Sequence, residues 1–181
     1  MSTYRIEPAR LLDAAERLAP PQVAPGRPPY TAHRRAVSTA YYAVFHAISA
    51  RVAEQAFPSA DALFRQRVRR WIGHDDIKTV ARWITQMRAG GGAQLPPHIR
   101  DLLAARQIGT GTAAIASGFL ELNDKREQAD YDHEAVFSRA ETLRLIALAR
   151  RLVGRIEATQ SDDAKRFFGL IAMQAKVRGR G

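Results

Sequence analysis

Residues 31–56, TAHRRAVSTAYYAVFHAISARVAEQA, decide the fold of this chain. Apolar side chains recur through this segment at intervals of three and four residues, which places them on one side of an α-helix. The members of the stripe are Val37, Tyr41, Val44, Ile48 and Val52. The segment therefore predicts a long helix with one buried side, capped by Thr31 and followed by the helix-breaking Pro58.

The other segments also repeat near 3.6 residues, and none alternates as a strand would. Further helices are expected over about 7–19, 61–72, 76–88, 97–130, 134–158 and 162–175, with 97–130 kinked near Gly109 and Gly111. Their expected starts include Ser59 or Asp61, Asp75 or Asp76, and the acidic segment 161–164. The prolines of 20–30 and the glycines of 89–97 predict loops. Short connections between amphipathic helices predict an all-α, antiparallel helical bundle.

One domain accounts for the 181 residues, and we find no internal repeat. The bundle is expected over 1–158, with an accessory C-terminal helix of the same domain over 159–175. Residues 176–181, KVRGRG, predict a basic flexible tail because their glycines do not sustain a helix.

Composition excludes several classes of protein. The chain has no cysteine, which excludes disulfides, thiolate nucleophiles and cysteine-based zinc sites. No apolar run reaches the length of a membrane span, and the charged start MSTYRIEPAR lacks a signal-peptide core. We therefore expect a cytoplasmic protein that does not enter a membrane, and no motif indicates a metal or another cofactor.

Positive charge is the main feature of the composition. The formal net charge is +10, and 24 of the 28 Lys and Arg residues are arginine, whose planar fork suits phosphate groups. A cluster in RQRVRRW, 65–71, and a second basic spot in HRR, 33–35, predict contacts with RNA or another polyanion. The predicted nucleic-acid-binding residues are Arg35, Arg65, Arg67, Arg69 and Arg70.

The segment KREQADYDH, 125–133, carries the candidate catalytic residues. If it is helical throughout, Arg126, Asp130 and His133 share one face at i, i+4 and i+7. Arg126 and His133 would then be about 10 Å apart along the axis, so a two-fold dimer is needed to bring one chain's arginine to the other's histidine. In such a cleft, the imidazole would move the proton of a ribose 2′-hydroxyl and the guanidinium would neutralise the phosphorus centre, without a metal. Asp130 would orient either partner.

The spacing by itself favours a structural interpretation of the same residues. An arginine and a histidine separated by four to six residues also occur at Arg27–His33, Arg67–His74 and Arg69–His74. An Arg–Asp pair at i, i+4 is an ordinary surface feature of helices.

Two motifs resemble the HEPN superfamily. RRAVSTAYYAVFHA resembles its Arg-x-x-Ser-x-x-Tyr-Tyr-Ala-x-Phe-His element, matched by Arg35, Ser38, Tyr41, Tyr42, Ala43, Phe45 and His46. FLELNDKREQADYD resembles the downstream Arg-x-x-Ala-Asp-Tyr element, matched by Arg126, Ala129, Asp130 and Tyr131. His74 resembles a histidine found between the two elements in that family, and the likeness covers roughly residues 4–158.

The resemblance implies a dimerising bundle of four core helices with accessory ones. It also implies a metal-independent endoribonuclease of the Arg-x(4–6)-His type, often a toxin paired with a nucleotidyltransferase-type antitoxin. Arg126 and His133 take these positions, with Asp130 beside them and Tyr131, Tyr42, His46 and Ser38 in support. Ala135 stands where the toxin branch has a modifiable tyrosine, so that regulation does not carry over.

Three functions therefore compete. The first is an endoribonuclease acting as a homodimer. The second is a non-catalytic binding module for a protein, a nucleotide or nucleic acid, in which Arg126, Asp130 and Tyr131 form a structural clasp or the docking site. The third is nucleic-acid binding through the arginines of 65–70, which should weaken steeply with salt.

Overall fold

The structure is a computed structural model that describes residues 6–19, 29–104 and 107–178. These residues form eight α-helices and one 3₁₀ turn, and none of them lies in a strand. The helices are α1 (Pro8–Leu18), α2 (Pro29–Ala56), α3 (Ala62–Arg69), α4 (His74–Arg88), α5 (Pro97–Ala104), α6 (Thr110–Tyr131), α7 (Arg139–Ala158) and α8 (Asp162–Arg178), with the 3₁₀ turn at Gly92–Gln94. The prediction of an all-α bundle is confirmed.

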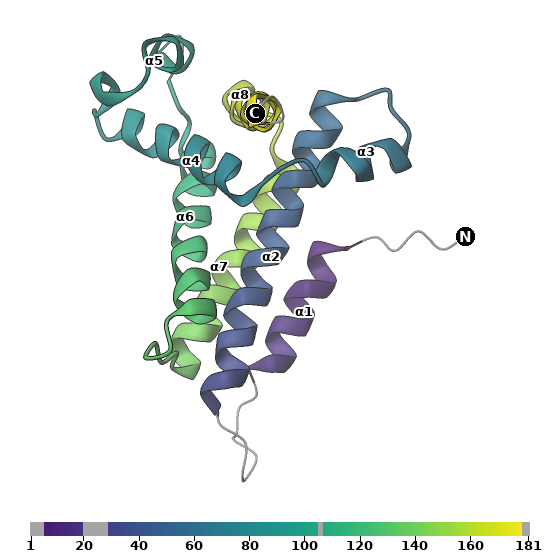
Figure 1. The fold of residues 1–181 in the computed structure, drawn as a ribbon, viewed down its shortest axis with the longest axis vertical. Helices are drawn as coiled ribbons and strands as arrows, with labels where there is room; N and C mark the ends of the chain where they lie inside the picture. The colour runs from purple at the N-terminus through teal and green to yellow at the C-terminus, as the bar shows by residue number, and fades with distance from the viewer. Residues whose placement is uncertain (1–5, 20–28, 105–106, 179–181) are drawn as a thin grey trace.

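Four helices, α1, α2, α6 and α7, lie side by side, and α2 is in the middle (Figure 1). α1 and α6 run in one direction and α2 and α7 in the other, so the connected pairs α1–α2 and α6–α7 are antiparallel (Figure 1). α2 also contacts α3 and α8, which makes it the element that most others pack against.

The sequence of α2 explains its central position. All five residues of the predicted stripe, Val37 to Val52, are fully or almost fully buried. A second row of small residues, Ala36, Ala40, Ala43 and Ala47, is buried too, and alanines let neighbouring helix backbones approach closely. α2 is therefore apolar on more than one side, as a helix enclosed by others must be.

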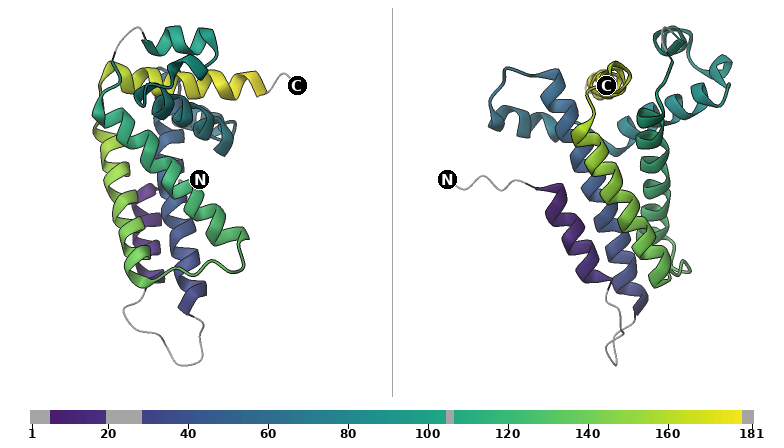
Figure 2. Two further views of the ribbon diagram at one scale, coloured as in Figure 1. Left: turned by 90° about the vertical axis from the view of Figure 1, so that its left-hand side faces the viewer. Right: turned by 180° about the vertical axis from the view of Figure 1, so that it is seen from behind.

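Helices α3, α4 and α5 gather at one end of the bundle together with α8 (Figure 1). α8 lies across that end and contacts α2, α4 and α6 (Figure 2). Phe167 and Phe168 of α8 are buried, so this helix closes the core. No helix of the described chain is long and apolar enough to cross a bilayer.

The prediction of one kinked helix over 97–130 is wrong, because α5 and α6 are separate helices. The backbone N–H of Gly109 donates to Asp163 Oδ2 over 2.8 Å, and Arg88 donates to the carbonyl of Ile108 over 3.1 Å. A β-carbon at Gly109 would lie 2.8 Å from the same carboxylate oxygen, so the close approach requires glycine. The break is therefore held by residues of α4 and α8 that are distant in sequence.

The expected start of the next helix at 134 is also wrong, since α7 begins at Arg139. Ser138 caps it by accepting a hydrogen bond from the N–H of Glu141 over 3.1 Å. The preceding loop is tied to α2. His33 Nδ1 donates to the carbonyl of Phe137 over 2.9 Å, and Arg34 donates to the carbonyls of Ala129 and Ala135 over 2.7 and 3.3 Å.

Other helix ends match the predictions in part. Asp61 caps α3 and the acidic pair Asp162 and Asp163 opens α8, as expected. α2 begins at Pro29 rather than after Thr31, and α4 begins at His74, with Asp76 accepting from the N–H of Gly73. α8 continues to Arg178, so the predicted tail is helical over 176–178; residues 179–181, and the loop residues 20–28, lie outside the described chain.

Candidate functional site

Arg126 is held inside a single chain by a set of contacts that we call the Arg126 clasp, formed by Ser38, Tyr42, Arg126 and Asp130. Arg126 Nε lies 2.8 Å from Asp130 Oδ2, and Arg126 Nη2 donates to the Tyr42 hydroxyl over 3.3 Å. The Ser38 hydroxyl donates to the other carboxylate oxygen, Asp130 Oδ1, over 2.5 Å. The clasp joins α2 to α6, and both motifs of the HEPN resemblance meet in it.

Aromatic rings cover the guanidinium of Arg126. Its Cζ lies 5.8, 5.9 and 5.4 Å from the ring centres of Tyr41, Tyr42 and Tyr131, within the range of cation–π attraction. Only 15% of the Arg126 side chain is exposed, against 25% for Asp130. The hydrogen bond from Arg126 to Tyr42 and the charge of Asp130 raise the pKa of Arg126 despite its burial. The arginine is therefore permanently charged, and Asp130, Tyr42 and the surrounding rings hold its guanidinium in place.

His133 does not join the clasp, because the condition for a shared helical face, a helix that continues through residue 133, is not met. α6 ends at Tyr131, and Asp132 is its C-cap, with an extended backbone. The Asp132 side chain accepts from the N–H of Glu134 over 2.9 Å, which fixes a turn at this point. His133 lies in this turn, exposed to solvent, because the helix on which its predicted position depends has already ended.

A layer of aromatic and histidine side chains lies next to the clasp. His74 stacks on Phe45 with ring centres 4.2 Å apart, and the Tyr41 hydroxyl lies 2.6 Å from His74 Nδ1. Burial raises the pKa of Tyr41, so its hydroxyl stays protonated beside the imidazole. Burial and the charge of Arg126 lower the pKa of His74, and burial together with Arg69 and His74 lowers that of His46. Both imidazoles are therefore neutral near pH 7.

These two histidines predict a loss of stability in mild acid. The unfolded chain binds their protons near pH 6.5, whereas the folded protein binds them only at lower pH. The free energy of unfolding should therefore be at its maximum above about pH 7 and should fall as the pH drops below about 6.5. Urea unfolding at pH 7.5 and 5.0 measures this difference, and His46→Gln with His74→Gln should reduce it. Equal stability of the unsubstituted protein at the two pH values would contradict the assignment.

The arginines of α3 have different environments. Arg65 is used internally, donating to the carbonyl of Ala60 over 2.9 and 2.7 Å, and Arg69 lies 3.9 Å from the carboxylate of Glu54. Arg67 and Arg70 are exposed. Arg35 is exposed as well, but it lies about 30 Å along α2 from the end that leads to α3, so it belongs to a different surface.

Trp71 is the functional candidate that the sequence analysis missed. This tryptophan is 70% exposed, which is unusual for so large an apolar side chain. Val68 and Ile72 of the same segment are buried against the core, whereas the Trp71 side chain lies on the solvent side. The available signal was its position directly after the arginine run, where a tryptophan supplies a flat apolar surface beside positive charge.

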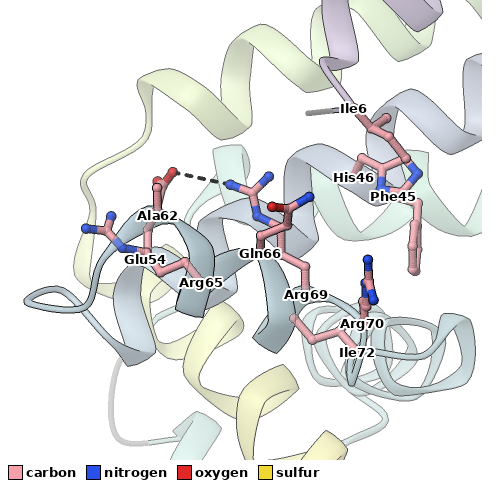
Figure 3. Close-up of a pocket in the computed structure, with 10 residues that line it drawn as sticks. All are labelled: Ile6, Phe45, His46, Glu54, Ala62, Arg65, Gln66, Arg69, Arg70 and Ile72. Atoms are coloured by element: carbon pink, nitrogen blue, oxygen red, sulfur yellow. Dashed lines mark ion pairs between the residues drawn. The ribbon is translucent and has the colours of Figure 1, made fainter. Parts of the chain in front are cut away.

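A pocket of about 700 Å³ opens between α2, α3 and Ile6, the residue two positions before α1 (Figure 3). Its apolar lining includes Phe45 and Ile72, and its basic lining includes Arg69 and Arg70. His46, which the resemblance gives as a supporting residue, also lines it. The sequence analysis did not anticipate this pocket, because its walls come from separate segments.

The clusters of acidic and histidine side chains do not indicate a metal centre. Within residues 6–19, 29–104 and 107–178, no group of three or more such side chains is arranged to hold a metal ion. The chemistry of the described site is that of arginines, neutral histidines and aromatic rings.

Comparisons with known proteins add no relative. No protein-family model, no curated protein and no solved structure matches the chain. The function must therefore be argued from the side chains of this molecule.

Proposed function

We propose that this chain is a HEPN-type helical module that binds single-stranded nucleic acid through α3 and the turn that follows it. The observation that carries the proposal is Trp71, which is 70% exposed and adjoins the exposed Arg70. Aromatic side chains stack on unpaired bases, and arginines next to them contact the phosphates of the same strand. A strand of this kind offers both a flat base and a negative charge.

The local backbone brings a second arginine to this surface. The N–H of Trp71 donates to the carbonyl of Val68 over 3.0 Å, so the helical turn continues past the last residue of α3. Arg67 is four residues before Trp71, a spacing that places two side chains on one side of a helical turn. The formal net charge of +10 supplies the long-range attraction for a polyanion.

The Arg126 clasp supports a binding module rather than a catalyst. A catalytic arginine must present its guanidinium to the substrate, and that of Arg126 is occupied by Asp130, Tyr42 and the surrounding rings. We assign the clasp to joining α2 and α6. Its charge pair then holds the fold, and the exposed arginines of α3 meet the ligand.

The test is the affinity of the protein for labelled single-stranded RNA, single-stranded DNA and duplex RNA, measured by fluorescence anisotropy over a range of salt. Binding should favour single strands and weaken steeply with salt. Trp71→Ala should weaken it by about 1–3 kcal/mol, the usual contribution of one stacked base. Val136→Ala removes another exposed apolar side chain and should change nothing. Absent binding, or equal affinity of the Trp71→Ala variant, would overturn the proposal.

An endoribonuclease is the second candidate, and one observation favours it. The loop that carries His133 is tied down on both sides, through the carbonyls of Ala129, Ala135 and Phe137, so the histidine is held outward in solvent. In a homodimer, a second copy would have to supply the arginine, and a nucleotidyltransferase-type antitoxin would be the expected partner. Incubating the same RNAs with the protein and a chelator tests this function. Cleavage that disappears in His133→Ala would favour the nuclease over the binding module.

A further inference from the structure

The lining of the pocket between α2, α3 and Ile6 has an apolar part and a basic part. Phe45, His46 and Ile72 make up the largely apolar part, which we call the apolar wall. Arg69 and Arg70 line it from α3 and the residue after that helix. Figure 3 draws Arg70 near Phe45 and His46, with Glu54 and Arg65 on the opposite side. A volume of about 700 Å³ falls in the usual range of pockets for small organic ligands.

The charges in the lining favour an anion. Three arginines and one glutamate line the pocket, so with neutral His46 the lining carries a net charge of +2. Arg65 turns its guanidinium to the carbonyl of Ala60 and contributes only its charge. Arg70, in contrast, is an exposed member of the lining, and its planar fork is suited to two phosphate oxygens.

We propose that this pocket binds a terminal nucleotide phosphate, with the phosphate facing Arg69 and Arg70 and the base against Phe45, His46 and Ile72. A terminal phosphate carries a charge of about −1.5 to −2 near pH 7, which matches the lining, whereas an internal phosphodiester carries one negative charge. The end of a nucleic-acid strand and a free nucleotide share this chemistry. For the strand end, the inference rests on the proposed function, because Arg70 adjoins Trp71 and links the pocket to the strand-binding surface.

The experiment compares single-stranded RNAs of one sequence and about ten nucleotides, ending in a 5′-phosphate, a 3′-phosphate or only hydroxyl groups. Each is labelled internally, and its dissociation constant is measured by anisotropy with the full chain. One of the phosphorylated ends should bind about tenfold more tightly than the hydroxyl end, since charge-assisted hydrogen bonds are gained. Adenosine monophosphate and inorganic phosphate are added as competitors in separate titrations.

The variants separate the pocket from the general charge of α3. Arg70→Gln should remove the preference for the phosphorylated end, and Arg69→Gln should reduce it. Arg67→Gln is the matched control: Arg67 is on the same helix but does not line the pocket, so it should weaken all three RNAs by the same factor. Thermal unfolding of each variant confirms that it is folded.

The outcomes distinguish the inference from the proposed function. Equal affinity for all three ends, with no competition by the nucleotide, would overturn the pocket assignment while strand binding stands. Binding of adenosine monophosphate that is lost in Arg70→Gln, without any RNA binding, would overturn strand binding and retain the pocket as a site for free nucleotides. Competition by inorganic phosphate as strong as that by the nucleotide would contradict the role of the apolar wall.

Discussion

Arg126→Ala should lower the free energy of unfolding by about 2–3 kcal/mol. The substitution leaves the Asp130 carboxylate without its ion pair and removes the donor to the Tyr42 hydroxyl. It also removes the cation that the rings of Tyr41, Tyr42 and Tyr131 surround. Removing one partner of a fully buried ion pair costs about 3–5 kcal/mol. Both side chains of this pair are partly exposed, so we expect a smaller cost here. Equilibrium unfolding in urea, followed by circular dichroism, measures the change.

Arg144→Ala is the matched control for this prediction. Arg144 Nη1 lies 2.7 Å from Glu121 Oε1, which is as short as the contact in the clasp, but the two side chains are 52% and 41% exposed. Exposed pairs contribute about 0–1 kcal/mol, so Arg144→Ala should be nearly neutral. Equal losses in the two variants would show that the clasp does not stabilise the fold. Unchanged stability of Arg126→Ala together with lost RNA cleavage would instead support a catalytic arginine.

Phe119→Ala should have the largest effect of any single substitution considered, a loss of about 3–5 kcal/mol. Phe119 is fully buried in α6, and its ring centre lies 5.5 Å from that of Tyr41 in α2. Truncation leaves a cavity between the two helices that the Arg126 clasp joins. Thermal and urea unfolding should both show the loss, and binding at α3 should persist at temperatures where the variant remains folded.

Phe64→Ala serves as the comparison within the same residue type. Phe64 is 41% exposed on α3 and meets Phe57 edge-to-face, with ring centres 5.1 Å apart. Its truncation should cost about 1 kcal/mol or less. A cost at Phe119 no larger than the cost at Phe64 would mean that the α2–α6 contact does not hold the core.

Much of the fold was determined by the sequence itself, because helical periodicity is a local property. The stripe from Val37 to Val52 predicted the buried side of α2, and all five of its residues are buried. Asp61 was one of two expected caps of α3, and the acidic start of α8 was expected as well, because both effects act within one turn of their own helix. The Arg126–Asp130 contact also follows from local spacing, since i, i+4 neighbours meet on any helix.

Contacts between distant segments decided the rest. The break before α6 depends on Asp163, which is 54 residues from Gly109, and the turn that removes His133 from the helical face is held by His33 and Arg34 of α2. Tertiary packing also turned Arg65 inward, left Trp71 exposed and assembled the pocket from α2, α3 and Ile6. The sequence alone determined where helices form and which side of each is apolar. Only the folded chain determined where helices stop and which charges remain available to a ligand, because both depend on partners that the sequence does not place nearby.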